Sequence, residues 1–357
     1  MPDAGDLSYT PPPLWRRLRL RRRRQGLLWR AFRARRQLKL AQDHTDQITS
    51  RDILLVAVLR NEENRLPHFL DYYRALGADH MLIVDNGSDD TTREILADQP
   101  DVSVWHTKAS YRASRFGVDW ANWLLAKYGH EHWCLTVDAD ELLVFPSALG
   151  TTLPELTETL DRHGHRGFGA LMLDMVPKDA LGDLKYQPGS DPIGLLNHFD
   201  PGPYRAERQS PLNNLWVQGG LRERKFFKDR PRRSPTLNKI PLVKWNRRWA
   251  YVISTHSLLP PRLNMIYGGP GSDTPSGALL HTKFLPEVVR KATVEKTRAE
   301  HFTHPELFDG YYDDLSANPV LWDEACVHYE GPDQLQALGL IGCGRGAQRI
   351  GPPDQSD

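Results

Sequence analysis

The chain has 357 residues, of which 39% are hydrophobic and 25% charged, so it can bury a large core and has the composition of an ordinary globular protein. Its three cysteines, Cys134, Cys326 and Cys343, are too few and too widely spaced for a disulfide framework or a zinc site. We therefore expect a reducing, cytoplasmic compartment. The longest apolar runs are far too short to cross a bilayer, and no signal peptide is recognisable.

The net charge of +1 hides a strongly basic segment near the N-terminus. Residues 1–13 are rich in proline and predict a disordered tail, whereas in residues 14–48 arginines are interleaved with Trp and Leu. Two interpretations of the basic segment stay open. It forms an amphipathic helix at an anionic membrane surface, peripheral to the inner membrane, or a solvated helix that packs its apolar stripe on the main domain. No nucleic-acid-binding motif accompanies the arginines, so nucleic acid is not an expected partner.

Apolar strands alternate with amphipathic helices from residue 49 to about residue 290. The runs Ile53–Leu59 and His80–Val84 predict strands buried on both faces of a parallel sheet, and Leu66–Leu76 predicts a helix ended by Gly77. We expect further strands at Val102–Trp105, Trp133–Val137 and Phe168–Val176, and further helices at Phe116–Tyr128 and Thr151–Gly164. This order predicts a doubly wound α/β domain, with ligands at the carboxyl ends of the strands.

Two regions outside these elements are also assigned. The segment 178–215 is rich in Pro, Gly, Asp and Asn, and its length favours a functional loop or lid. Residues 285–302 predict an amphipathic helix, and residues 291–357 predict a helical C-terminal extension.

Polar side chains follow three of the predicted strands, at Asn61-Glu62, at Asp85 and at Asp138-Ala139-Asp140. The last group, with Glu141, places three acids in four residues, which repel one another unless a cation compensates them. Oxygen ligands of this kind suit Mg²⁺ or Mn²⁺.

Both acidic positions also have plainer interpretations. The acidic group could be a turn that caps a helix, because Asp and Glu favour a first helical turn. Asp85 could accept hydrogen bonds from a nucleobase or a sugar hydroxyl, or it could simply cap the turn at residues 86–88.

Two common nucleotide-binding motifs are missing. The turn after the first strand reads Arg60-Asn-Glu-Glu63, without the glycines of a dinucleotide-binding loop, and no phosphate-binding loop ending in Gly-Lys-Ser/Thr occurs. A nucleotide would then be held by carboxylate and amide contacts, with its diphosphate on a metal at the Asp-x-Asp segment.

Together these segments resemble the family 2-like nucleotide-sugar glycosyltransferases with the GT-A fold. The resemblance covers residues 50–150 well and extends more loosely to about residue 290. It depends on three motifs in this order, Arg60-Asn-Glu-Glu63, Val84-Asp-Asn-Gly-Ser-Asp-Asp-Thr-Thr92 and Val137-Asp-Ala-Asp-Glu-Leu142. The Glu-Asp pair and the Gln-x-x-Arg-Trp motif of many family members are not recognisable downstream, which leaves the catalytic base and the acceptor site open.

The resemblance implies a GT-A-type mixed sheet flanked by helices and a metal-dependent transfer of a sugar from a nucleoside diphosphate donor to a hydroxyl of a glycan or lipid-linked acceptor. It places Asn61, Glu62 and Asp85 around the nucleoside, and Asp138 and Asp140 around the metal and the diphosphate. By the same resemblance His281 completes the ligands of Mn²⁺ or Mg²⁺, and Lys283 lies near the phosphates.

The residues allow a mechanism to be outlined. Arg222 is a candidate to bind phosphate oxygens, although a solvated charged turn explains the cations around it equally well. If the anomeric carbon is inverted, as the resemblance implies, a carboxylate must take the proton of the acceptor hydroxyl. Glu223 is the first candidate for this base and Asp174 the second.

Three other functions are compatible with parts of the sequence. A sugar-nucleotide pyrophosphorylase shares the fold and the metal, but it needs a glycine-rich first loop. A glycoside hydrolase uses two facing carboxylates without a metal. A non-enzymatic membrane-surface adaptor would depend on residues 16–36 alone.

Overall fold

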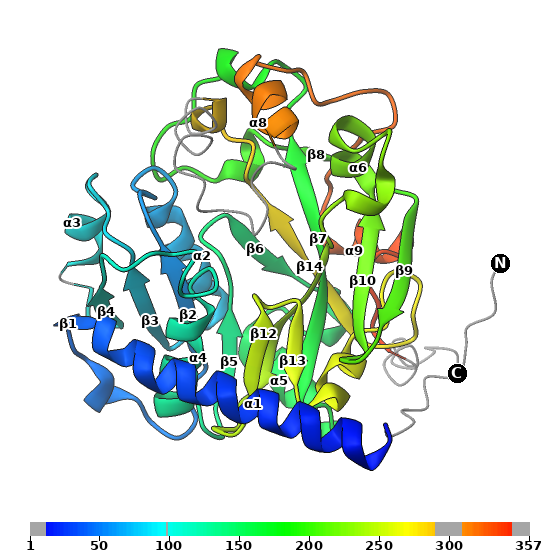
Figure 1. Ribbon diagram of the computed structural model, residues 1–357. Coiled ribbons are helices and arrows are strands. Elements are labelled where there is room, and N and C mark those ends of the chain that lie inside the picture. The colour runs from blue at the N-terminus through cyan, green and yellow to red at the C-terminus, as the bar shows by residue number, and fades with distance from the viewer. Residues whose placement is uncertain (1–11, 98, 290–308, 345–357) are drawn as a thin grey trace, which may run out of the picture.

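The first apolar run of the domain forms a strand, β2, that lies between two parallel neighbours in the middle of the fold. The computed structural model describes residues 12–97, 99–289 and 309–344, and these form an 11-stranded sheet with helices on both faces (Figure 1). The predicted α/β class, a mixed sheet flanked by helices, is thereby confirmed. In spatial order the main path of the sheet is β1 (Lys39–Gln42), β4 (Val102–His106), β3 (His80–Asp85), β2 (Leu54–Leu59), β5 (Trp133–Thr136), β11 (Asn238–Lys244), β7 (Gly167–Val176), β14 (Ser276–His281) and β6 (Glu141–Val144).

The strands β4, β3, β2 and β5 run parallel; the register aligns the carboxyl ends of β4, β3 and β2, and β5 ends three residues earlier. Leu59 at the end of β2 pairs with Asp85 at the end of β3, and Val56 pairs with Thr136 at the end of β5. The segments that follow these three strands therefore leave the sheet at one edge, as the order of elements predicts for an α/β sheet.

Both faces of this parallel half are buried, which explains why its strands are apolar without alternation. Leu54 and Val56 of β2 point into a core shared with α4, whereas Leu55 and Ala57 point into a core shared with α2 and α5. The helices of the domain are α2 (Leu66–Leu76), α3 (Thr92–Leu96), α4 (Val118–Tyr128), α5 (Leu153–Arg162) and α6 (Gly220–Phe226).

Local sequence signals fix the ends of the helices. The helix α2 has the predicted bounds and ends at Gly77, whose φ of 98° a side chain would resist. The helix α4 begins at Val118, two residues later than predicted, because Arg115, Phe116 and Gly117 all have left-handed φ angles.

The acidic segment crosses the edge of the sheet. It connects β5 to β6, and β11, β7 and β14 lie between those two strands. Because β7 and β14 are parallel and β11 runs against both β7 and β5, the segment meets the carboxyl ends of β7 and β14 and the amino end of β11. This crossing brings Asp138 and Asp140 to Lys239 of β11, Asp174 of β7 and His281 of β14.

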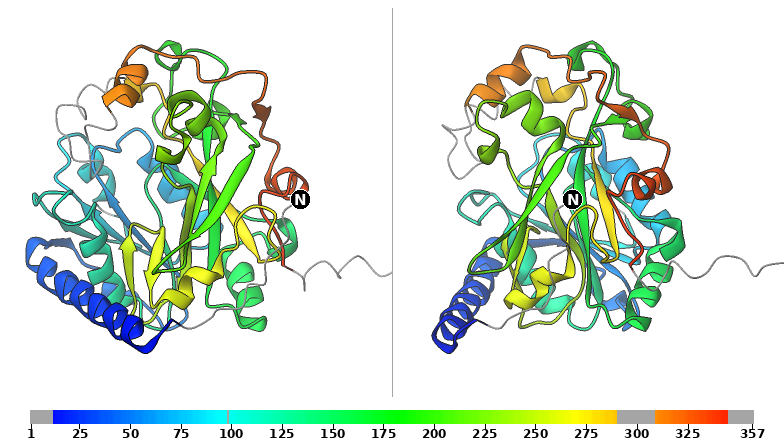
Figure 2. Two further views of the ribbon diagram at one scale, coloured as in Figure 1. Left: turned by 45° about the vertical axis from the view of Figure 1, so that its right-hand side comes forward. Right: turned by 90° about the vertical axis from the view of Figure 1, so that its right-hand side faces the viewer.

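Residues 14–34 of the basic segment form one long helix, α1 (Leu14–Ala34), on the outside of the molecule, where it lies against α4 (Figure 2). The rest of the predicted helical segment 14–48 does not continue this helix, because Lys39–Gln42 form β1 and pair with β4 in the main sheet. The buried side chains of α1 are Leu20, Leu27, Ala31 and Ala34. The predicted packing of an apolar stripe on the main domain is therefore confirmed. Among the helices that the structure describes, none is long and apolar enough to span a membrane.

The segment 178–215, predicted as an irregular functional loop, is partly regular. It contains β8 (His198–Phe199), which extends the main sheet, and the first strand of a hairpin formed by β9 (Tyr204–Gln209) and β10 (Asn214–Gly219). A second hairpin is formed by β12 (Ala250–Ile253) and β13 (Ser257–Leu259).

The predicted C-terminal extension is described only over residues 309–344. That part holds α8 (Asp309–Ser316), β15 (Val327–His328) and α9 (Pro332–Ala337), and β15 pairs with β8. The predicted helix at residues 285–302 lies mostly outside the described residues.

Candidate functional site

A buried lysine from β11 holds the acidic segment that follows β5. The Nζ atom of Lys239 lies 3.1 Å from Oδ2 of Asp138 and 2.9 Å from Oε1 of Glu141, and only 4% of the lysine side chain is exposed. Burial alone would lower the pKa of Lys239, but Asp138 and Glu141 outweigh burial and raise it, so the lysine is charged. The charge of Lys239 thus compensates the carboxylates of Asp138 and Glu141, two of the three acids that lie close together in the sequence.

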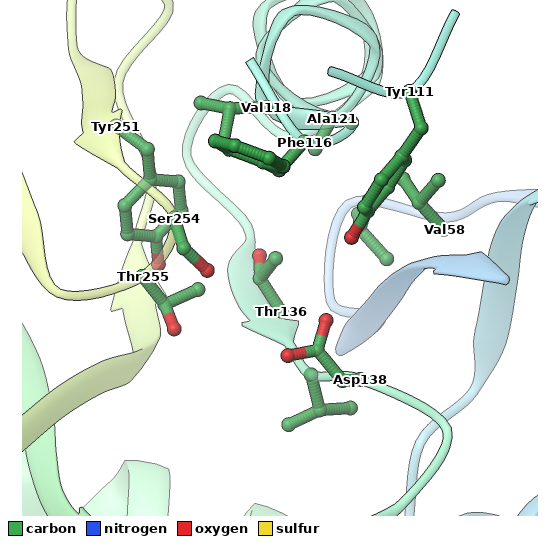
Figure 3. Close-up of a pocket in the computed structure, with 13 residues that line it drawn as sticks. Val58, Tyr111, Phe116, Val118, Ala121, Thr136, Asp138, Tyr251, Ser254 and Thr255 are labelled. Atoms are coloured by element: carbon green, nitrogen blue, oxygen red, sulfur yellow. The ribbon is translucent and has the colours of Figure 1, made fainter. Parts of the chain in front are cut away.

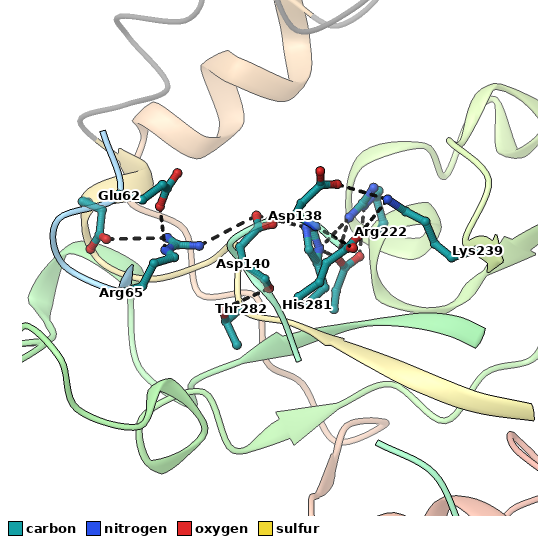
Figure 4. Close-up of polar contacts among 11 residues, drawn as sticks. Glu62, Arg65, Asp138, Asp140, Arg222, Lys239, His281 and Thr282 are labelled. Atoms are coloured by element: carbon teal, nitrogen blue, oxygen red, sulfur yellow. Dashed lines mark hydrogen bonds and ion pairs between the residues drawn. The ribbon is translucent and has the colours of Figure 1, made fainter. Parts of the chain in front are cut away.

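A second series of contacts runs from Asp140 to Arg222 through two strand ends (Figure 4). Nε2 of His281 lies 3.2 Å from Oδ2 of Asp140, and Nδ1 lies 2.6 Å from Oδ1 of Asp174. Asp174 also accepts a hydrogen bond of 3.0 Å from Nε of Arg222. His281 and Asp174 are paired residues of the parallel strands β14 and β7, so the backbone register itself fixes their contact.

The neighbours decide the charge of each group in this series. Burial would lower the pKa of His281, but Asp140 and then Asp174 outweigh burial and raise it, which favours the charged imidazole. Burial would raise the pKa of Asp140, but His281 and then Arg65 hold it well below its usual range. Arg222 and His281 have the same effect on the pKa of Asp174. Every carboxylate in the series is therefore ionised and already faces a cation.

Arg65 connects the first strand-end loop to this series. It is buried at the start of α2, lies 3.0 Å from Glu62 and 3.8 Å from Asp140, and also lies 3.6 Å from Glu287. The loops after β2 and β3 are joined as well, because Asn61 donates a hydrogen bond of 2.6 Å to Asp89.

The three proposed metal ligands are only partly gathered. Within the described residues, no group of three or more His, Cys, Asp or Glu side chains is arranged to hold a metal ion. The 3.2 Å between Oδ2 of Asp140 and Nε2 of His281 nevertheless fits two adjacent ligands of one octahedral ion, which at bond lengths of about 2.1 Å lie about 3.0 Å apart. His281 is also oriented through its other nitrogen by Asp174, the usual support of a metal-binding histidine. Asp138, whose side chain is 50% exposed, is turned toward Lys239 instead.

A narrow, mostly apolar hollow opens beside Asp138 at the ends of β2 and β5 (Figure 3). Tyr111 and Phe116 form one side of it and Tyr251 another, and the carboxylate of Asp138 faces the same space. The hydroxyl of Thr255 is buried there without a hydrogen-bond partner among the described residues. The hollow has a volume of about 30 Å³, which is room for about one water molecule.

The backbone at this hollow is strained. Arg115 and Phe116 have φ angles of 56° and 59°, and Ser254 on the opposite side has a φ of 39°. Left-handed residues other than glycine are uncommon and gather at functional sites.

Asp85 lies at the same edge but is not free to meet a ligand. Its side chain is fully buried, and Oδ1 accepts a hydrogen bond of 3.1 Å from the amide of Ser88. Oδ2 lies 2.9 Å from Arg93 and 3.2 Å from His106. Both oxygens are thus occupied, and the contact with Ser88 is the turn cap that the sequence left open as an alternative.

The remaining predicted residues lie in different surroundings. Lys283 follows His281 and is close enough to Asp140 to contribute to the lowering of its pKa. Glu223, on α6, is directed toward Arg205 of β9, with Oε1 2.6 Å from Nη1. The first candidate base is therefore held by the β9–β10 hairpin rather than by the strands that carry Asp174 and His281.

Comparisons with known proteins found only partial similarities to solved structures. No family model matches the chain, and no curated protein matches it. Some solved structures are similar over part of their length. A 4-diphosphocytidyl-2C-methyl-D-erythritol synthase is 19% identical with a TM-score of 0.25, and the match covers 37% of this chain and 63% of that one.

Two mycobacterial structures match at the same level. A structure described only as a mycobacterial protein is 18% identical with a TM-score of 0.25, covering 49% of this chain and 50% of that one. The glucosyl-3-phosphoglycerate synthase of Mycobacterium tuberculosis, in complex with Mn²⁺, UDP and phosphoglyceric acid, is 19% identical with a TM-score of 0.23, covering 41% and 51%. The chain thus spans less than two thirds of each of these structures, and likeness of this degree says nothing about its activity.

Several residues of the site were not anticipated from the sequence. Lys239 carries a usable signal, because a lysine at the start of an apolar strand must find a buried partner. Arg65 lies between the predicted strand Ile53–Leu59 and the predicted helix Leu66–Leu76, Tyr111 stands in a segment with no regular pattern, and Phe116 is predicted as the first residue of a helix. Nothing in the sequence pointed to their meeting beside Asp138.

Proposed function

We propose that the chain is a metal-dependent glycosyltransferase that moves a sugar from a nucleoside diphosphate donor to a hydroxyl acceptor, a glycan or a lipid-linked saccharide, with inversion. One observation carries the proposal. The Asp138–Asp140 segment crosses the carboxyl edge of the sheet so that one of its carboxylates faces an oriented histidine while the other borders an apolar hollow.

We place the nucleobase at this hollow, whose walls must move apart to admit a ring because its volume is about 30 Å³. Its aromatic walls suit a stacked ring, and the hydroxyl of Thr255 offers a hydrogen bond that is otherwise unmade. Asn61 and Glu62 then stand beside the nucleoside. Because both oxygens of Asp85 are occupied, we assign it to holding the loop at residues 86–92 rather than to contacting the base.

Asp140 and His281 would hold Mn²⁺ or Mg²⁺ once Nε2 of His281 gives up the proton that faces Asp140, because a histidine binds a metal only in its neutral form. Asp138 would join them once its carboxylate leaves Lys239. The ion supplies Lewis-acid stabilisation of the departing diphosphate when bound. The chain contributes the rest. Asp174 keeps Nε2 of His281 aimed at Asp140, and Lys283 brings positive charge to the rim where the diphosphate would lie. Arg222 is buried and paired with Asp174, so it must leave that carboxylate before it can bind a phosphate oxygen.

The proton of the acceptor hydroxyl needs a carboxylate. Asp174 is a weak base because Arg222 and His281 hold its pKa below the usual range. Glu223 remains the first candidate, and it must release Arg205 to act.

Release of nucleoside diphosphate from a panel of UDP, GDP, CDP, ADP and dTDP sugars, with Mn²⁺ and without acceptor, tests the proposal. We expect slow hydrolysis of one donor class that Asp140→Asn abolishes, while Asp161→Asn, an exposed partner of Lys244, retains it. Hydrolysis that persists in folded Asp140→Asn, or that withstands a chelator, would refute the metal site. Release of pyrophosphate from nucleoside triphosphates instead would favour a pyrophosphorylase.

A further inference from the structure

The helix α1 is apolar on two opposite faces. One face is buried through Leu20, Leu27 and Ala31, which pack toward α4 and the β12–β13 hairpin. An ion pair of 2.9 Å between Arg30 and Asp119 of α4 fastens the helix to the domain. The orientation of α1 on the domain is therefore fixed, and its outer face is a defined surface of the molecule.

The outer face carries large exposed apolar side chains, and of these, within the described structure, only the ring of Phe32 is known to contact α4, through Trp123, and to lie beneath the guanidinium of Arg35. At 100° per residue they fall on one stripe, opposite the buried one. They are Leu14, Trp15, Leu18, Trp29 and Phe32, with exposed fractions of 68%, 60%, 50%, 60% and 38%. Arginines flank the stripe on both sides, and α1 contains no acidic residue. A stripe of Trp and Leu between rows of cations is the pattern of a helix that lies in a membrane interface.

A second feature lies beside α1. A hollow of about 800 Å³ between the helix and the β12–β13 region is lined by four arginines, and Glu131 is the only carboxylate among the residues that line it. The arginines are Arg24, Arg166, Arg248 and Arg262. Among the described residues none of the four is paired with a carboxylate, so the hollow holds uncompensated positive charge. Burial lowers the pKa of Arg24, and the nearby charges of Arg21, Arg248 and Arg262 lower it further. The contribution of these charges indicates that the arginines repel one another.

An apolar groove continues from this hollow. It shares Arg24, Pro260 and Arg262 with the hollow, and its further walls are leucines and prolines together with two more arginines of α1, Arg17 and Arg21. A cationic hollow that opens into an apolar groove matches a lipid, whose phosphate and acyl chain have the same arrangement. A nucleic acid would meet the charge but would leave the exposed Leu and Trp side chains without partners.

We propose that α1 docks this protein on an anionic bilayer, with the outer stripe at the level of the headgroups and with Arg24, Arg248 and Arg262 around the phosphate of an acidic phospholipid. This inference is independent of the proposed activity. It also relates the membrane to the candidate site, because the open end of the β12–β13 hairpin borders the groove while its tip, Ser254-Thr255, lines the hollow beside Asp138. Four residues of strand span about 13 Å, so the candidate site lies within reach of a lipid-linked acceptor.

Flotation of the full chain with vesicles tests the proposal. We expect binding to phosphatidylcholine vesicles that contain about 30% phosphatidylglycerol, and little binding to pure phosphatidylcholine. The triple variant Arg24→Gln, Arg248→Gln and Arg262→Gln should bind the anionic vesicles about 100-fold more weakly, since each cation near the surface contributes about fivefold. The matched control replaces Arg230, Arg232 and Arg233 by Gln, which removes the same charge from an exposed turn that lines neither the hollow nor the groove and should change binding less than fivefold.

A second variant separates the stripe from the charge. Trp15→Gln, Leu18→Gln and Trp29→Gln should keep the fold, measured by circular dichroism, and lose vesicle binding at 0.5 M salt, where screening leaves mainly the apolar contribution. Equal loss in the two arginine variants would overturn the assignment of the hollow. Dimerisation abolished by the stripe variant, with no vesicle binding by the parent protein, would make the stripe an interface between two copies. Equal affinity for an RNA duplex and for vesicles would also refute the proposal.

Discussion

Single cations hold together carboxylates that come from different elements of the site. Lys239 reaches Asp138 and Glu141, and Arg65 reaches Glu62 and Asp140. Glu141 is only 1% exposed, so its charge depends on Lys239. A buried pair contributes little net stability when intact, but removing one partner leaves a charge without compensation.

Replacing Lys239 by Met should therefore destabilise the protein by about 3–5 kcal/mol, because Asp138 and above all Glu141 lose their buried cation. Urea denaturation measures the change. Lys244→Met, on the same strand, removes a partly exposed pair with Asp161 and should cost no more than about 1 kcal/mol. The double variant Lys239→Met and Glu141→Gln should recover part of the loss. Equal effects of the two single variants would show that Lys239 is not buried among charges as described.

His256, at the tip of the β12–β13 hairpin, is neutral in the folded protein. Burial and then the charge of Lys239 lower its pKa to about 3, and its Nδ1 contacts the carbonyl of Asn238. The unfolded chain takes up a proton near pH 6.5, whereas the folded chain does not until the pH approaches 3, so the folded state loses stability as the pH falls through this window.

The variant His256→Gln should remove that part of the acid lability. Its stability relative to the parent protein should be constant above pH 7.5 and should improve by up to about 1.4 kcal/mol for each pH unit below 6.5. Urea denaturation at pH 8.0, 6.5 and 5.5 measures it. A difference that does not change with pH would mean that His256 titrates normally.

At the scale of elements, the start of α4 forms one wall of the candidate site. Gly117 precedes the helix with a φ of 75°, and a Cβ there would lie 2.9 Å from Cγ1 of Val58 in β2. The helix and the strand can approach this closely only with glycine at this position, and the approach places Phe116 over the hollow.

The variant Gly117→Ala should destabilise the protein more than Gly164→Ala does. Both residues have left-handed φ angles, 75° and 72°, but a Cβ on Gly164 meets nothing within 4 Å. The Gly164 variant should lose about 1 kcal/mol from backbone strain alone, and the Gly117 variant about 1–3 kcal/mol more from the contact with Val58. Thermal unfolding of the two variants measures the difference. Equal losses would mean that the strand has room for the side chain.

Elements with strong periodicity could be predicted from the sequence, and elements formed by distant pairing could not. The helix α2 has its predicted bounds because its apolar period and Gly77 are both local signals. The strand β9 was not predicted, because its polar sequence Tyr204–Gln209 forms a strand only through its pairing with β10. The late start of α4 was also missed, since left-handed residues such as Phe116 have no sequence signature.

At the scale of the whole molecule, the sheet topology explains both what could be foreseen about the site and what could not. The meeting of the segments after β2, β3 and β5 follows from parallel strands in order, which the alternation of elements reveals. The positions of Lys239 and Asp174 follow instead from the crossing between β5 and β6 over three later strands. No local sequence pattern predicts such a crossing. The cations that balance the acidic segment could therefore be identified only from the fold.

The most direct test of the central claim is the binding of nucleoside diphosphates with and without Mn²⁺, measured by thermal unfolding of the full chain. With UDP, GDP, CDP, ADP and dTDP as probes, we predict that one of them stabilises the protein only when Mn²⁺ is present, by about 2.7 kcal/mol at one hundred times its dissociation constant. Asp140→Asn should abolish this stabilisation and Asp161→Asn should preserve it. Stabilisation that does not need the metal, that survives Asp140→Asn, or that no nucleoside diphosphate produces would contradict the account.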